Sequence, residues 1–117
     1  MTANNKSQFL KGCARVLVLR ILAERPMYGY EISHELKERS RGLFELGQGT
    51  LYPMLYSLER AALIGIDREE DAPGSGRKRI YYRITPKGKK ELERDLSIWE
   101  QVERGMKLVL RHAHEAG

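Results

Sequence analysis

The spacing of apolar residues divides the first half of the chain into three helical stretches. Apolar residues recur at helical intervals from about Ser7 to Glu24, which predicts a helix capped by Ser7 and ended by Arg25-Pro26. This stretch is more apolar than a surface helix requires, so we expect its N-terminal part to pack against a second subunit. A second, more polar helix is expected from about Tyr30 to Ser40.

A third helix is expected where two glycines and a threonine lead into an apolar stripe. Gly49 and Thr50 suit a turn and a helix start, and Leu51, Leu55 and Leu58 follow at spacings of four and three. One face of this helix is therefore apolar. Its N-terminal end carries hydrogen-bonding side chains, as a DNA recognition helix requires.

The pattern then changes to that of two strands. A short β-like run begins at Leu63, Asp71 to Gly76 form a dense turn signal, and the segment from Arg77 to Ile84 is rich in β-branched and aromatic residues. A hairpin is predicted. Tyr81 and Tyr82 are expected to place one hydroxyl on the outer face and one ring in the core.

Thr85-Pro86 then suits the start of a long helix that runs to about His112. Apolar residues recur along it every seven positions, which is typical of a helix that packs against other helices, including a symmetry mate. We expect the subunit interface to consist of two residues of the first helix, Leu10 and Cys13, and of six residues of this last helix: Leu92, Leu96, Val102, Met106, Val109 and Leu110.

The order of elements predicts a mostly α fold with a small β-hairpin. It corresponds to a winged helix-turn-helix domain over residues 1–85, followed by a C-terminal dimerisation helix over residues 86–117. The turn between the second and third helices is longer than in the tightest helix-turn-helix.

The distribution of charge indicates that the partner is a nucleic acid. The chain of 117 residues has a net charge of +5, and the segment from Arg77 to Arg94 alone carries eight basic and two acidic residues, a net +6. Positive charge is therefore local, and Arg77, Lys78 and Arg79 are expected to meet DNA phosphates. Gln48, Thr50 and Tyr52 are expected to contact DNA from the third helix, although Tyr52 could instead brace that helix.

The sequence gives little support for a disulfide, a metal site, an enzymatic activity or a membrane span. The single cysteine, Cys13, excludes an intramolecular disulfide and a cysteine-built zinc site. We expect no metal, no cofactor and no enzymatic activity, because no catalytic arrangement of side chains has supporting context. No apolar run suits a membrane span or a signal peptide, so a cytoplasmic location is expected.

Three linked motifs resemble the PadR family of bacterial transcriptional regulators. They are Tyr28-Gly29-Tyr30-Glu31-Ile32, Gly49-Thr50-Leu51-Tyr52-Pro53, and Gly76-Arg77-Lys78-Arg79 with Tyr81 to Thr85. The resemblance implies a homodimeric repressor that binds an inverted-repeat operator on double-stranded DNA and is released by a small molecule. Tyr28 and Gly49 join the expected DNA contacts. One departure is Ala61-Ala62, where the family usually has a charged residue and glycine.

The short C-terminal helix resembles that of a subfamily of small members, some of which bind planar multidrug ligands between subunits. This resemblance implies that Trp99, Phe9 and Val16 line such a pore, with Glu103 and Arg104 at its polar rim. Trp99 could equally be part of the dimer core. Two other functions remain open: an architectural DNA-binding protein without an effector, and a winged-helix protein–protein adaptor.

Overall fold

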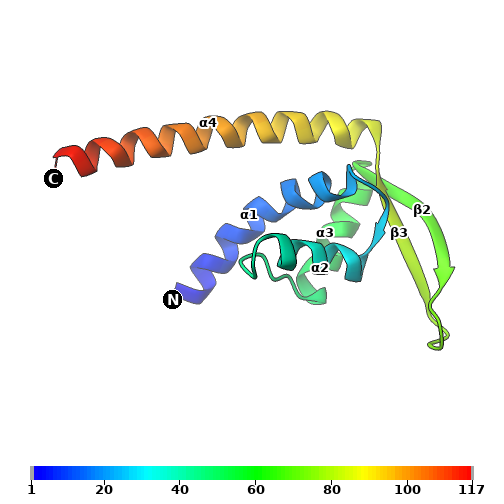
Figure 1. Ribbon diagram of the computed structural model, residues 1–117. Coiled ribbons are helices and arrows are strands. Elements are labelled where there is room, and N and C mark those ends of the chain that lie inside the picture. Colours follow the sequence, from blue (N-terminus) through cyan, green and yellow to red (C-terminus); the bar gives the residue numbers. More distant parts are fainter. Residues whose placement is uncertain (1, 117) are drawn as a thin grey trace.

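The fold consists of four helices and one small sheet (Figure 1). The computed structural model describes the backbone of residues 2–116 and the side chains of residues 11–111. The elements, in chain order, are α1 (Thr2–Leu22), β1 (Met27–Tyr28), α2 (Gly29–Arg39), α3 (Gln48–Arg60), β2 (Ile64–Asp71), β3 (Lys78–Ile84) and α4 (Pro86–Ala116). The predicted winged helix fold, mostly α with a β-hairpin, is confirmed.

Two details differ from the sequence prediction. Helix α1 begins at Thr2, five residues before the expected cap at Ser7. The hairpin also gains a third strand, because Met27 and Tyr28 pair antiparallel with Tyr82 and Tyr81, so that β3 lies in the middle of the sheet. This short strand ties the start of α2 to the hairpin.

The core lies where α1, α2 and α3 meet the sheet. Apolar stripes of the three helices are fully buried there, including Leu19, Ile32 and Leu55, and Ile64 and Tyr82 close the core from the sheet. Burial of such stripes supplies most of the stability of helices this short.

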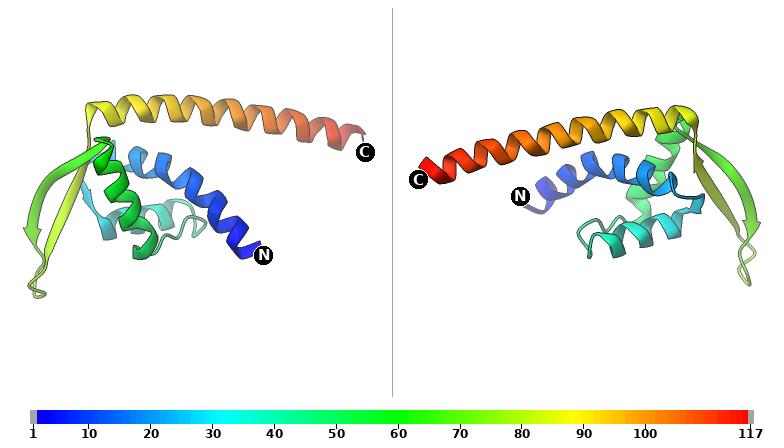
Figure 2. Two further views of the ribbon diagram at one scale, coloured as in Figure 1. Left: turned by 180° about the vertical axis from the view of Figure 1, so that it is seen from behind. Right: turned by 45° about the horizontal axis from the view of Figure 1, so that its top comes forward.

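Helix α4 belongs to this core only at its beginning. Leu92 is 6% exposed and packs within the core, and Leu96 is half-buried against it. Beyond these residues α4 passes along α1 and continues past the rest of the molecule, as both views of Figure 2 show. At 1.5 Å per residue its 31 residues span about 46 Å, which explains the elongated shape, with a longest extent of 61 Å. No helix within residues 2–116 is long and apolar enough to cross a membrane.

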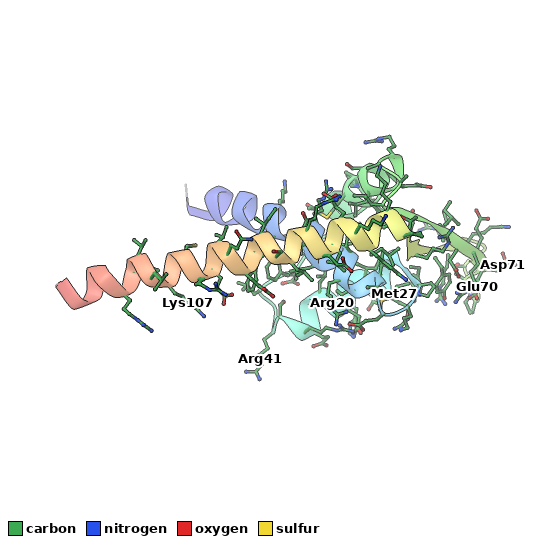
Figure 3. The ribbon with its side chains drawn as sticks, turned by 90° about the horizontal axis from the view of Figure 1, so that it is seen from above. Arg20, Met27, Arg41, Glu70, Asp71 and Lys107 are labelled. Carbon is green, nitrogen blue, oxygen red and sulfur yellow. The ribbon has the colours of Figure 1, made fainter. Side chains whose placement is uncertain are left out.

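The start of α3 and the tip of the hairpin lie on the side of the molecule opposite α4 (Figure 1). A turn at Gly74 and Gly76, both with positive φ, closes the hairpin. Glu70 and Asp71 of β2 stand opposite Arg79 and Lys78 of β3. In the view from above, Glu70 and Asp71 lie at the hairpin end, far along the molecule from Lys107 (Figure 3).

A tight junction joins the hairpin and α4 to the end of α3. The Thr85 hydroxyl donates to the carbonyl oxygen of Ala62 at 2.7 Å and accepts from the amide of Gly88 at 3.0 Å, which caps α4 as expected. The Lys87 ammonium donates to the Ala61 carbonyl at 2.9 Å. The first turn of α4 and the last turn of α3 are therefore held together.

Candidate nucleic-acid interface and helical cavity

The N-terminal end of α3 presents polar groups on an exposed surface. Gly47 caps the helix, so Thr50 lies in the first turn and is not the cap. Gln48 and Gly49 are exposed and Thr50 is half-buried, whereas the apolar face at Leu51 is buried. The helix is thus anchored along one side and open at its start, the geometry of a helix that enters a major groove.

Tyr52 contacts the start of α2. Its ring is half-buried and lies directly over Gly29, where an added Cβ atom would come within 2.5 Å of the Tyr52 hydroxyl oxygen. Gly29 therefore allows α2 and α3 to approach closely. This contact supports the bracing role of Tyr52 and leaves its expected DNA contact a prediction.

Three basic side chains at the end of the hairpin form no salt bridge within the described part of the chain. Of these, Arg77 and Lys78 are exposed and Arg79 is half-buried. Arg68 of β2, by contrast, donates to Asp67 at 3.0 Å and to Glu70 at 2.7 Å. The returning strand can therefore offer its charge to phosphates.

Tyr82 supplies the expected ring to the core, and Tyr81 lies on the opposite face of β3, although it too is largely buried. Tyr82 lies in the core, where desolvation and, secondarily, Glu59 raise its pKa to about 12. Tyr81 lies on the other face of β3, covered by the guanidinium of Arg68 at 3.8 Å and by the ring of Tyr28 at 5.2 Å. A β-bulge between Ile66 and Arg68 accompanies this arrangement.

A cavity of about 490 Å³ lies between α1 and α4. Val16 and Trp99, which the resemblance places in a pore between subunits, both line this cavity of the single chain, and so does Cys13. Trp99 is 51% exposed in the single chain. The cavity is mostly apolar, as ligand sites commonly are. Phe9 and Leu10 lie outside the residues whose side chains the structure describes.

The residues expected at the polar rim lie apart from this cavity within one chain. Glu103 and Arg104 line a separate shallow hollow with Glu100 and Lys107, so within one chain they do not border the cavity of Trp99. The polar groups at that cavity are instead Arg15 and Asp95. The seven-residue pattern of α4 did not reveal Asp95, because this residue lies beside the apolar stripe, and Arg15 comes from α1.

The distal half of α4 carries an uncovered apolar stripe. Its members are about half exposed or more: Ile98, Trp99, Val102, Met106, Val109 and Leu110. Leu92 differs, because burial in its own subunit leaves almost none of its surface for a partner. The expectation of Leu92 as a dimer contact is therefore corrected, and Leu96 is already partly covered.

Sequence reasoning also missed residues at both places. Phe44, from the connection between α2 and α3, lines the helical cavity. Its only signal was an aromatic residue between Leu43 and Leu46 in the connection. Tyr30 and Tyr56 are exposed beside the hairpin, and their clustering there depends on how α2 and α3 pack.

Known proteins share this arrangement. The sequence matches the transcriptional regulator PadR-like family over residues 18–94. It is 31% identical over 110 residues to the transcriptional regulator Rv3488 of Mycobacterium tuberculosis, covering 94% of this chain and 95% of that protein. A PadR-like transcriptional regulator from Bacillus cereus has a similar structure, with a TM-score of 0.74 at 32% identity, covering 88% of this chain and 96% of the other. A PadR family transcriptional regulator from Eggerthella lenta gives a TM-score of 0.78 at 27% identity, covering 93% and 91%. The chain therefore belongs to the PadR-like family of DNA-binding transcriptional regulators.

Proposed function

We propose that this protein is a homodimeric repressor that binds an inverted-repeat operator and is released by a small, planar aromatic ligand. The observation that carries the proposal is the apolar stripe on the distal half of α4. In the single chain this stripe faces solvent, and burial of large apolar side chains is the main driving force of association.

A second copy of the chain suits this stripe for two reasons. The stripe continues a seven-residue repeat, as in helices that pair with one another, and it lies far from the DNA-facing side of the molecule. Pairing along α4 would hold two recognition helices at a fixed separation. Two helices so held can read two half-sites of a symmetric operator.

The cavity between α1 and α4 supports a ligand at the same interface. Trp99 and Phe44 supply aromatic rings, and Trp99 also belongs to the uncovered stripe. A flat aromatic molecule could stack on Trp99 between the subunits. Asp95 would favour a cationic ligand and Arg15 an anionic one, but Arg15 already pairs with Glu91 at 3.5 Å.

The junction at Thr85 offers a path from ligand to DNA. Because the start of α4 is hydrogen-bonded to the end of α3, a change in how two α4 helices pack would move both recognition helices. A ligand that prefers the more widely separated arrangement lowers operator affinity by its differential affinity for the two states.

Dimerisation is tested by sedimentation equilibrium of the wild type and of Val109→Glu. A charge within the stripe should weaken association by about 30-fold or more. Gln101→Glu adds the same charge at a polar position of α4 and should leave association unchanged. A wild type that stays monomeric at high concentration would overturn the proposal.

Ligand binding is tested by the emission of Trp99, the only tryptophan in the chain. Titration with a planar aromatic cation such as ethidium, without DNA, should quench this emission with a saturable curve. Unchanged emission with a panel of such cations would leave Trp99 as a packing residue and favour an architectural DNA-binding protein without an effector. Loss of all DNA binding at low salt would favour the adaptor function.

A further inference from the structure

A second cavity, of about 330 Å³, lies between the hairpin and helices α2 and α3. Tyrosines from β1, α2, α3 and β3 line it, together with basic residues at the end of the hairpin turn and on β3. The six residues used below are Tyr28, Tyr30, Tyr52, Tyr56, Arg77 and Arg79. No described side chain that lines it carries a carboxylate. The cavity thus combines positive charge with hydroxyl donors, which suits an anion.

The guanidinium of Arg79 is held in place without a salt bridge to any described side chain. Its guanidinium lies 4.8 Å from the ring centroid of Tyr28, a cation–π contact that orients the group and leaves its N–H donors free. Glu70 stands opposite Arg79 in the sheet, but its carboxylate accepts a hydrogen bond from Arg68 at 2.7 Å. Arg68 therefore binds the carboxylate that stands opposite Arg79 in the sheet.

Two of the tyrosines are unusually exposed for such large side chains. Tyr30 is 64% exposed and Tyr56 is 48% exposed, and neither hydroxyl has a hydrogen-bond partner among the described residues. A phenol can donate one hydrogen bond to a phosphate oxygen, while its ring packs against a deoxyribose. Such rings fit a sugar–phosphate chain better than a free inorganic anion.

We propose that this cavity binds one phosphodiester group of the DNA strand that borders the major groove entered by α3. Arg77 and Arg79 supply the charge, and Tyr30 and Tyr56 donate the hydrogen bonds. The proposal rests on DNA binding by the face that carries the start of α3. It adds a contact that fixes the angle between α3 and the DNA, because it joins α2, α3 and the hairpin through one phosphate.

The first test measures the affinity of the full-length protein for a duplex from its own upstream region and for a random duplex of equal length. Tyr30→Phe and Tyr56→Phe should each weaken binding about 5-fold on both duplexes, because each loses one hydrogen bond to a charged group. The dependence on salt should stay unchanged, since no charge is removed. Arg79→Ala should instead reduce the salt slope by about one.

Tyr81→Phe is the matched control, because it removes a phenolic hydroxyl that does not line the cavity. Its affinity should stay within about 2-fold of the wild type. All three tyrosine variants should keep the thermal midpoint of the wild type, which separates a lost contact from a lost fold.

The second test locates the phosphate. Replacing single phosphates of the upstream duplex by methylphosphonates should identify one position in each half-site at which the wild type loses affinity. The Tyr30→Phe, Tyr56→Phe double variant should lose no further affinity at that position. Wild-type affinity in the double variant, or the absence of any such coupled position, would overturn the proposal. Failure of the wild type to bind any duplex at low salt would instead contradict DNA binding itself.

Discussion

Gly88, in the first turn of α4, lies so close to the main-chain carbonyl oxygen of Leu63 that an added Cβ atom would overlap it. This contact closes the junction between the end of α3, the hairpin and α4. Because the obstacle is backbone, it has little freedom to move away. The start of α4 can therefore approach the end of α3 only with glycine at this position.

The first prediction concerns this contact. Gly88→Ala should lower the free energy of unfolding by about 1–3 kcal/mol, the usual cost of forcing an extra carbon into a packed site. Urea denaturation would measure it. Gly105→Ala is the control, because nothing lies within 4 Å of a Cβ at that position of α4, and it should gain up to about 1 kcal/mol from helix propensity. Equal effects of the two substitutions would contradict the tight junction.

The second prediction concerns Ala62, just past the end of α3. Its φ of 61° lies in the left-handed region, which disfavours a residue with a side chain. Ala62→Gly should therefore stabilise the protein by about 1 kcal/mol, measured as a higher urea midpoint. Ala61→Gly, at the preceding position with a φ of −80°, should not stabilise it. A loss of stability in Ala62→Gly would mean that the turn needs its methyl group.

The third prediction is a pH dependence of stability at the contact between the segment after α1 and the end of α2. Hydrogen bonds from Arg39, at 2.6 and 2.7 Å, lower the pKa of Glu24 from its ordinary value of 4.5. A depressed pKa means that the folded state releases this proton more readily than the unfolded state. The contribution is therefore complete above pH 4.5 and disappears as the pH falls through the lower pKa of the folded protein.

Denaturant midpoints measured across this acid range provide the test. Glu24→Gln should lower stability at neutral pH and flatten the fall in stability on acidification. Glu38→Gln is the control, because its carboxylate accepts no arginine hydrogen bond and lies 4.0 Å from His34. If Glu24→Gln left the dependence of stability on pH unchanged, the pair of Glu24 and Arg39 would not contribute to the loss of stability in acid.

The helices and the hairpin could be predicted because their signals are local. The four-three spacing of Leu51, Leu55 and Leu58 and the Thr85-Pro86 cap depend only on neighbouring residues, and both occur as expected. Strand β1 was missed because two residues carry no periodicity, and it exists only through pairing with β3. The burial of Tyr81 likewise depends on Tyr28 and Arg68, which are distant in sequence.

The candidate sites likewise contain some residues that are contiguous in sequence and others that only packing brings together. The basic run on β3 and the polar start of α3 are contiguous in sequence and could be recognised there. The cavities could not, since Phe44 reaches the first and Tyr56 the second only after the helices have packed. The seven-residue repeat of α4 was informative but treated Leu92 and Trp99 alike, although only the distal half of the helix extends beyond the core.

The fourth prediction concerns charge across the hairpin. Arg68→Ala should release Glu70 to pair with Arg79 and so weaken DNA binding several-fold, although Arg68 does not line the cavity beside α3. In the Arg68→Ala background, adding Glu70→Gln should raise the affinity for DNA. This gain should be larger than the effect of Glu70→Gln in the wild type, and a double-mutant cycle would measure the difference. Purely additive effects would indicate that Arg68 contacts DNA directly.

The fifth prediction concerns the central claim, that two copies of this chain read a symmetric site on DNA. Hydroxyl-radical footprinting on the upstream region of its own gene measures this most directly. Two symmetric protected segments are expected, with centres about 10 base pairs apart or a small multiple of that spacing. A single asymmetric segment, or uniform protection along the duplex, would contradict the account.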